Sequence, residues 1–289
     1  MVKISIIGVG NLGSCTAYEI ANRGIADELV LVDIDKKRAE GEAEDIKQAV
    51  ALKNKTKIVA GDYKDITESD VIVVTAGKPR TPDIKTRQEL GKINSKIIKS
   101  VAEKIKENAP GSIIVTVTNP VDVMNYLMWK ETGFGRERVI GAGGQLDSAR
   151  FTSTLGKEGV VMGEHGDCQI LLWSKVQGKY DAAQKNKIFE KIRESARDVI
   201  TKKGATVYAP ANTIADVVQS IVKDEKKTMM CSYVLQGEYW GRDLSLGVPV
   251  KLGFKGAEEL VKWELSKEER EQFENAIKEI KKNIKEILN

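Results

Sequence analysis

Residues 3–13 read KISIIGVGNLG, and this stretch decides the fold. The apolar run 3–7 predicts a buried β-strand, and GVGNLG follows it directly, ahead of an apolar pattern at helical spacing. A second apolar strand at 28–32 ends on Asp33, twenty residues after Gly13. A strand, a Gly-x-Gly-x-x-Gly turn, a helix and a second strand ending on an acid together indicate a dinucleotide-binding βαβ unit.

Each part of this unit has a physical task. Gly8 permits the tight turn, Gly10 lets the backbone approach a pyrophosphate, and Gly13 allows helix and strand to pack closely. The start of the helix offers unpaired N–H groups and a positive dipole end to phosphates. The sequence therefore predicts a phosphate-binding turn at 8–13, with a purely structural glycine turn as the less favoured alternative.

Asp33 indicates which dinucleotide binds. We expect its carboxylate to bind the adenosine ribose hydroxyls and to repel a 2′-phosphate, which favours NAD. Lys36, Lys37 and Arg38 lie just beyond and could offset that repulsion, so NADP is disfavoured without being excluded.

Alternation of strands and helices continues through the first half. Helices are predicted at 37–50 and 88–108, and strands at 57–60, 71–75 and 112–117, while residues 139–141 form a short apolar segment. This order is typical of an α/β Rossmann domain with a doubly wound parallel sheet, which binds ligands at the carboxyl ends of its strands. The last long strand leads into Asn119-Pro120, where we expect a cis peptide bond. We place this dinucleotide-binding domain at residues 1–143.

The second half predicts an α+β substrate domain over residues 144–289. Its helices are expected from residue 145, at 189–203 and 211–222 and from residue 267, with strands at 228–235 and 248–252. Asp147 and Arg150 are three residues apart, so they share one face of the first of these helices. From spacing alone, an ordinary ion pair within the helix is the favoured interpretation.

His165 is the only histidine, and it stands between two glycines in the stretch 163–167, GEHGD. Histidine titrates nearest neutrality and suits proton exchange with a hydroxyl or carbonyl. Taken alone, a histidine without function is the slightly favoured interpretation. The motifs around it favour the catalytic one.

Bulk composition narrows the classes of function. A net charge of +4 arises from 46 basic and 42 acidic residues, a mixture that gives little reason to expect nucleic acid but suits small anions. No apolar run reaches membrane-spanning length, and three scattered cysteines predict neither a disulfide framework nor a metal site. We expect a cytoplasmic protein, and the abundance of Lys and Glu resembles thermophile composition.

Several motifs coincide across nearly the whole chain, and together they resemble the lactate/malate dehydrogenase superfamily, most closely its archaeal malate dehydrogenases. The matching segments are GVGNLG with LVDID, GEAEDI, TAGKPRTP, TNPVDVM, GGQLDSARF, GEHGD, GATVYAPA and GVPVKLG. The resemblance implies an NAD-dependent malate dehydrogenase of the tricarboxylic acid cycle, a small dicarboxylic 2-hydroxy or 2-oxo acid as substrate, and a homotetramer.

The resemblance also implies roles for individual residues. His165 would exchange the hydroxyl proton, Asp147 would orient and stabilise its imidazolium, and Arg87 would polarise the carbonyl from a closing loop. Arg150 would grip the carboxylate beside the reacting carbon, while Asn119 and Thr206 would contact the substrate. The cofactor site is expected to comprise Gly8, Gly10, Asn11, Leu12, Gly13, Asp33, Thr75, Ala76, Gly77, Asn94, Val117 and Asn119.

Arg80 is implied to decide the substrate, because an arginine at that position pairs with the distal carboxylate of malate or oxaloacetate. Burying an unpaired arginine against a methyl group is costly, so Arg80 would also reject pyruvate. Six residues separate Arg80 from Arg87, one more than the family pattern. Fourteen separate Arg150 from His165, fewer than that pattern, which could alter subunit contacts or the geometry of His165.

Four alternatives stay open at this point. An L-lactate or broader 2-hydroxy-acid dehydrogenase differs only in the chemistry at Arg80. An NAD-dependent glycosidase would need a metal held by Cys and His, and a thiol hydrolase would pair Cys168 with His165 at poor spacing. A non-catalytic NAD-binding protein would bind the cofactor without turnover.

Overall fold

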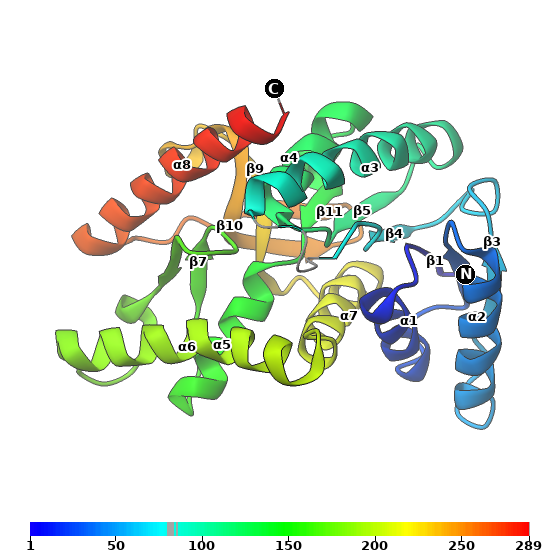
Figure 1. The fold of residues 1–289 in the computed structure, drawn as a ribbon, viewed down its shortest axis with the longest axis horizontal. Helices are drawn as coiled ribbons and strands as arrows, with labels where there is room; N and C mark the ends of the chain where they lie inside the picture. Colours follow the sequence, from blue (N-terminus) through cyan, green and yellow to red (C-terminus); the bar gives the residue numbers. More distant parts are fainter. Residues whose placement is uncertain (80–83, 85, 289) are drawn as a thin grey trace.

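A computed structural model describes residues 1–79, 84 and 86–288, and Figure 1 shows their arrangement. The first half comprises β1 (Lys3–Ile7), α1 (Asn11–Asn22), β2 (Glu28–Val32), α2 (Lys36–Val50), β3 (Lys57–Gly61), β4 (Val71–Val74), α3 (Arg87–Asn108), β5 (Ile113–Thr116), α4 (Val121–Thr132) and β6 (Val139–Gly141). The second half comprises α5 (Gly144–Leu155), β7 (Val161–Gly163), β8 (Gln169–Leu171), α6 (Ala182–Lys203), α7 (Tyr208–Val222), β9 (Thr228–Gln236), β10 (Arg242–Gly253), β11 (Gly256–Leu260) and α8 (Lys267–Leu288).

The first six strands form a parallel sheet in the order β3-β2-β1-β4-β5-β6. Strands β4 and β5 are buried along their whole length, as expected of apolar strands covered by helices on both faces. Figure 1 shows α3, α4 and α8 on one side of the sheet and α1 and α7 on the other. The prediction of a doubly wound α/β domain is confirmed.

The second half continues the same sheet with antiparallel strands. Gly141 of β6 pairs with Ser232 of β9, and β9 pairs along its length with β10. Strands β7, β8 and β11 extend this part, giving one sheet of eleven strands over the described residues. The α+β character of the second half is confirmed, and the proposed boundary at 143/144 falls where α5 begins.

Local chemistry explains where several helices start earlier than predicted. Thr86 accepts a hydrogen bond from Glu89 N at 3.0 Å, so α3 begins at Arg87. Asp181 and Gln184 form a capping box that starts α6 at Ala182, before the predicted residue 189. Helix α7 starts at Tyr208 and takes Pro210 into its first turn, where a missing N–H costs little.

The differences between predicted and observed strands also have simple causes. Strand β10 runs over twelve residues because its pairing with β9 carries it well beyond the predicted 248–252. Strands β7 and β8 have three residues each, too few to show a periodic pattern, and were not predicted. The Asn119-Pro120 peptide bond is cis, as predicted.

Candidate active site

The carboxyl ends of β1, β4 and β5 bring three loops of the first half together. Gly8 follows β1 with φ of +94°, and the hydroxyl of Thr75, which follows β4, donates to its carbonyl oxygen. Ala76 N donates to Ile7 O at 2.8 Å, so the loop after β4 is fixed against the glycine turn. Val117 continues the neighbouring strand β5, its N–H donating to Val74 O at 2.9 Å.

The glycines of this turn differ in the space that they leave for a side chain. Gly8 and Gly13 are closely packed, whereas Gly10, where a phosphate is expected, faces open space. A Cβ at Gly8 would lie 2.5 Å from Ala76 N, and one at Gly13 would overlap the Gly8 carbonyl oxygen. A Cβ at Gly10 would meet nothing within 4 Å. Gly10 is also the N-cap of α1, whose first residues Asn11 and Leu12 present the positive end of the helix. These residues therefore fit the pyrophosphate of a dinucleotide.

The Asp33 carboxylate stands at the end of β2, beside this turn. Its Oδ2 accepts from Val9 N at 2.7 Å and its Oδ1 from Asp35 N at 2.9 Å. Two backbone N–H groups thus hold the carboxylate next to the glycines, where a ribose would lie. Arg38 donates to Asn11 Oδ1 at 3.2 Å, which places a cation across the same turn.

Asn94 of α3 braces the opposite wall of the expected cofactor site. Its Oδ1 accepts from Lys78 N and its Nδ2 donates to Asn119 O, both at 2.7 Å. The side chain is almost fully buried, so it joins the loops after β4 and β5. Gly77 packs so closely that a Cβ there would lie 2.6 Å from a methyl carbon of Thr118.

His165 and Asp147 meet beside this edge of the sheet. Asp147 lies in the first turn of α5, which follows β6, and His165 lies in the loop between β7 and β8. His165 Nδ1 is 2.7 Å from Asp147 Oδ2, and Arg150 Nη1 is 3.2 Å from Asp147 Oδ1. The structure thus brings together three predicted residues, and Asp147 contacts both other members.

The electrostatic setting of His165 suits a proton carrier. Burial alone would lower its pKa, but the Asp147 carboxylate outweighs burial and raises the pKa above its ordinary value. Because Nδ1 faces the Asp147 carboxylate, the neutral imidazole carries its proton on Nδ1, and the lone pair of Nε2 can accept a second proton. The His165 side chain is 17% exposed, so a substrate can reach it.

A second buried carboxylate fixes the backbone at His165. Asp122, in the first turn of α4, accepts from His165 N at 2.8 Å and from the Ser232 hydroxyl at 2.5 Å. Burial raises the pKa of Asp122 to about 6. A Cβ at Gly143 would lie 2.9 Å from His165 Cγ, so this glycine lets the ring pack closely. Asp122 was not predicted as a site residue, although it lies in the TNPVDVM motif that contains Asn119.

Arg87 lies in the first turn of α3 and not on the preceding loop, because Thr86 caps the helix. Its Nη1 is 2.8 Å from Glu164 Oε1, and its Nη2 donates to the carbonyl oxygen of His165 at 2.8 Å. Arg87 is therefore held beside the loop that carries His165. Glu164 was not predicted as a site residue, and its only signal in the sequence is its place next to His165.

Three predicted substrate-binding residues remain, and the structure describes two of them. Asn119 is exposed after β5, and Thr206 is partly buried in the turn between α6 and α7. Arg80 lies outside the described residues.

Burial and the neighbouring Glu164 carboxylate raise the pKa of Cys168 to about 11, which keeps this thiol protonated and argues against the thiol hydrolase.

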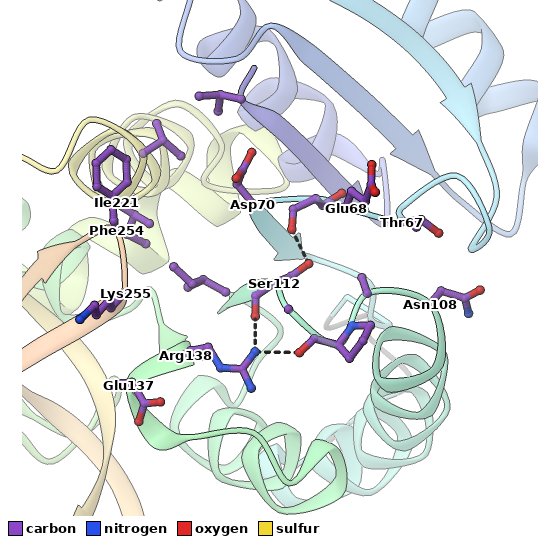
Figure 2. A pocket seen from close by; sticks show the side chains of 17 residues that line it. Thr67, Glu68, Asp70, Asn108, Ser112, Glu137, Arg138, Ile221, Phe254 and Lys255 are labelled. Atoms are coloured by element: carbon purple, nitrogen blue, oxygen red, sulfur yellow. Dashed lines mark hydrogen bonds between the residues drawn. The ribbon is translucent and has the colours of Figure 1, made fainter.

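A cavity also lies at the opposite ends of the parallel strands, where those strands begin. It encloses about 790 Å³ and is lined by residues that precede β1, β4, β5 and β6, among them Asp70, Ser112 and Arg138. Figure 2 shows Arg138 turned toward the backbone there, and its Nη1 donates to Pro110 O at 2.8 Å. This cavity is separate from the His165 site.

Among the described residues, no helix is long and apolar enough to cross a membrane. No group of three or more His, Cys, Asp or Glu side chains in the described ranges is placed to hold a metal ion.

A dinucleotide cradle next to a His–Asp–Arg cluster defines an oxidoreductase-type site on a Rossmann fold. Residues 2–141 match the lactate/malate dehydrogenase NAD binding domain, and residues 145–289 match the alpha/beta C-terminal domain of the same family. The chain belongs to the lactate/malate dehydrogenase family, whose members are oxidoreductases acting on a CH–OH group, and its cofactor is NAD.

Individual relatives agree on the family and divide on the substrate. The chain is 39% identical over 304 residues to a malate dehydrogenase of Halobacterium salinarum, covering 99% of this chain and 100% of the relative. It is 36% identical over 309 residues to L-lactate dehydrogenase 1 of Clostridium acetobutylicum, covering 99% and 98%. A structure of malate dehydrogenase from Archaeoglobus fulgidus in complex with NADH superimposes with a TM-score of 0.94 at 39% identity, over 100% of both chains. These matches favour a dehydrogenase over the NAD-dependent glycosidase.

Proposed function

We propose that the chain is an NAD-dependent malate dehydrogenase, which interconverts L-malate and NAD with oxaloacetate, NADH and a proton. The observation that carries this proposal is the His165–Asp147 contact of 2.7 Å, with Arg150 on the other oxygen of Asp147. The cluster stands beside a glycine turn that fits a dinucleotide. When bound, the nicotinamide cofactor supplies hydride transfer to or from the reacting carbon.

His165 and Asp147 account for the proton. Since Nδ1 faces Asp147, Nε2 is the atom that accepts the hydroxyl proton in malate oxidation and returns it in oxaloacetate reduction. Asp147 holds the ring orientation and stabilises the imidazolium that forms. The raised pKa of His165 keeps a larger protonated fraction available for the reductive direction.

Arginines account for the charge of the substrate. Arg150 would bind the carboxylate next to the reacting carbon, which orients that carbon toward His165. Arg87 would stabilise negative charge on the reacting oxygen, and it already contacts the His165 backbone. Asn119 and Thr206 are proposed to complete the substrate pocket, and residues 8–13, 33, 75–77, 94, 117 and 119 to hold the cofactor.

Arg80 supports malate over lactate. Its cation would pair with the distal carboxylate of a dicarboxylic acid, and pyruvate would leave it without a partner. The archaeal malate dehydrogenases among the relatives support the same choice. L-Lactate dehydrogenase is the second candidate, because lactate dehydrogenases match the chain at almost the same identity.

Replacing the proton carrier tests the reaction. In His165→Asn, we expect turnover of oxaloacetate to fall at least a hundredfold, because general acid–base catalysis is removed. NADH binding, followed by cofactor fluorescence, should stay within twofold. Equal turnover in wild type and His165→Asn would overturn the mechanism, and binding without turnover in the wild type would support the non-catalytic alternative.

Four further properties stay predictions: a cytoplasmic location, a homotetrameric assembly, a role in the tricarboxylic acid cycle and a thermophilic source. They are supported by the resemblance and by the Lys- and Glu-rich composition. Mass measurement in solution and a thermal melt test the assembly and the thermostability.

A further inference from the structure

The Arg87 guanidinium lies in a cradle made by three consecutive residues of the loop between β7 and β8. Glu164 Oε1 is 2.8 Å from Nη1, and the His165 carbonyl oxygen accepts from Nη2 at 2.8 Å. The third residue, Gly166, contributes the space, because a Cβ there would overlap Arg87 Nη1. The loop that carries the proposed proton carrier is thus shaped to receive an arginine.

Glu164 makes this cradle selective for a cation. Its side chain is only 1% exposed, and a buried carboxylate without a partner is costly. Its second oxygen, Oε2, accepts from Cys168 N at 3.1 Å. One carboxylate therefore closes the turn of its own loop and provides the counter-ion of Arg87.

We propose that Glu164 is a positioning residue for the proposed reaction, on which this inference rests. It holds the first turn of α3 against the His165 loop, so that Arg87 and His165 meet the same substrate oxygen as one unit. A guanidinium carries five N–H donors, more than these two contacts use, so Arg87 can keep its counter-ion while it donates to a substrate.

The Glu164→Gln variant tests the proposal, because it removes the charge of this side chain. In Glu164→Gln, the side chain keeps its size and an oxygen for Cys168 N, but it no longer neutralises Arg87. We expect kcat for 2-oxo acid reduction to fall about 10- to 100-fold, with a smaller change in KM. NADH affinity should stay within twofold, because the glycine turn and Asp33 are unaltered.

The experiment compares wild type, Glu164→Gln, Glu164→Asp, Arg87→Gln and the Glu164→Gln/Arg87→Gln double variant. Glu158→Gln is the matched control, because it removes an exposed carboxylate six residues earlier in the chain and should keep wild-type kcat. The double variant should be no slower than Arg87→Gln, and Glu164→Asp should recover part of the activity. Wild-type kcat in Glu164→Gln, or losses that multiply in the double variant, would overturn the proposal.

Hydrogen exchange separates this proposal from the proposed function. If the wild type reduces no 2-oxo acid, the proposed function fails, and the pairing is then judged by amide exchange. Arg87→Gln should speed exchange at Cys168 N, and Glu164→Gln should speed exchange at Glu89 and Leu90 in the first turn of α3. Unchanged exchange at both places would overturn the positioning role as well.

Discussion

Asp147 binds His165 with one carboxylate oxygen and Arg150 with the other, at 2.7 and 3.2 Å. Asp147 and Arg150 lie on one face of α5, and His165 lies in the loop after β7. A single carboxylate therefore contacts a residue of its own helix and a residue of this loop. Burial acts to lower the pKa of His165, and the Asp147 carboxylate acts to raise it. Asp147 also ties the proposed proton carrier to the proposed carboxylate-binding residue.

Replacing Asp147 by Asn should move the pH dependence of the reaction. Reduction of a 2-oxo acid needs protonated His165, so kcat/KM falls as pH rises through the pKa of His165. Asp147 raises that pKa, so in Asp147→Asn the fall should move to lower pH, with kcat/KM reduced about a hundredfold or more. A pH profile from 5 to 9 measures both. An unshifted descending limb in the variant would show that Asp147 does not tune His165.

Two alanine substitutions in the glycine turn should separate cofactor binding from folding. A Cβ at Gly10 has open space, so Gly10→Ala should keep the melting temperature and weaken NADH binding at least tenfold. A Cβ at Gly13 meets the Gly8 carbonyl, so Gly13→Ala should lower the free energy of unfolding by about 1–3 kcal/mol. Urea unfolding and NADH titration measure the contrast, and full NADH affinity in Gly10→Ala would place the pyrophosphate elsewhere.

Removing the charge of Asp33 should relax the choice of cofactor. Asp33→Asn keeps the shape and an oxygen for one of the two backbone N–H groups, but no longer repels a 2′-phosphate. With Arg38 nearby, the ratio of kcat/KM for NADPH to that for NADH should rise at least tenfold, about 1.4 kcal/mol. Initial rates with both cofactors measure this ratio. If it stays at the wild-type value, Asp33 does not contact the ribose.

Asp122 should make stability depend on pH in a predictable direction. Burial raises its pKa in the folded chain to about 6, whereas an unfolded aspartate titrates at about 3.9. Between these values the folded chain binds more protons, so the contribution of Asp122 to stability is present at low pH and is lost as pH rises through 6. Urea unfolding at pH 4.5 and 7 should show wild type losing stability relative to Asp122→Asn as pH rises. Parallel pH dependences of the two chains would contradict this.

The sequence predicts those parts of the molecule that depend on short-range patterns of residues. The unit from β1 to Asp33 follows from two apolar runs, three glycines and one acid at fixed spacing, and the structure confirms it. The Asp147–Arg150 pair also follows from spacing on one helix. Its third member, His165, is eighteen residues from Asp147, and only the resemblance connected the two.

Buried polar partners are what the sequence does not reveal. Asp122 meets His165 across 43 residues, and Arg87 meets Glu164 across 77 residues, in each case between the two halves. Such contacts depend on how α3 and α4 dock on the loop after β7, which no local pattern records. The segment before His165 is shorter than the family pattern, and the Asp147–His165 contact is nevertheless formed, at 2.7 Å.

The most direct test of the account is NADH oxidation with oxaloacetate and with pyruvate, measured in parallel for the wild type and for Arg80→Gln. Arg80 is the residue proposed to choose between the two acids, so the account predicts a strong preference for oxaloacetate that collapses in the variant. A wild-type preference for pyruvate would contradict the malate assignment and identify a lactate-type enzyme.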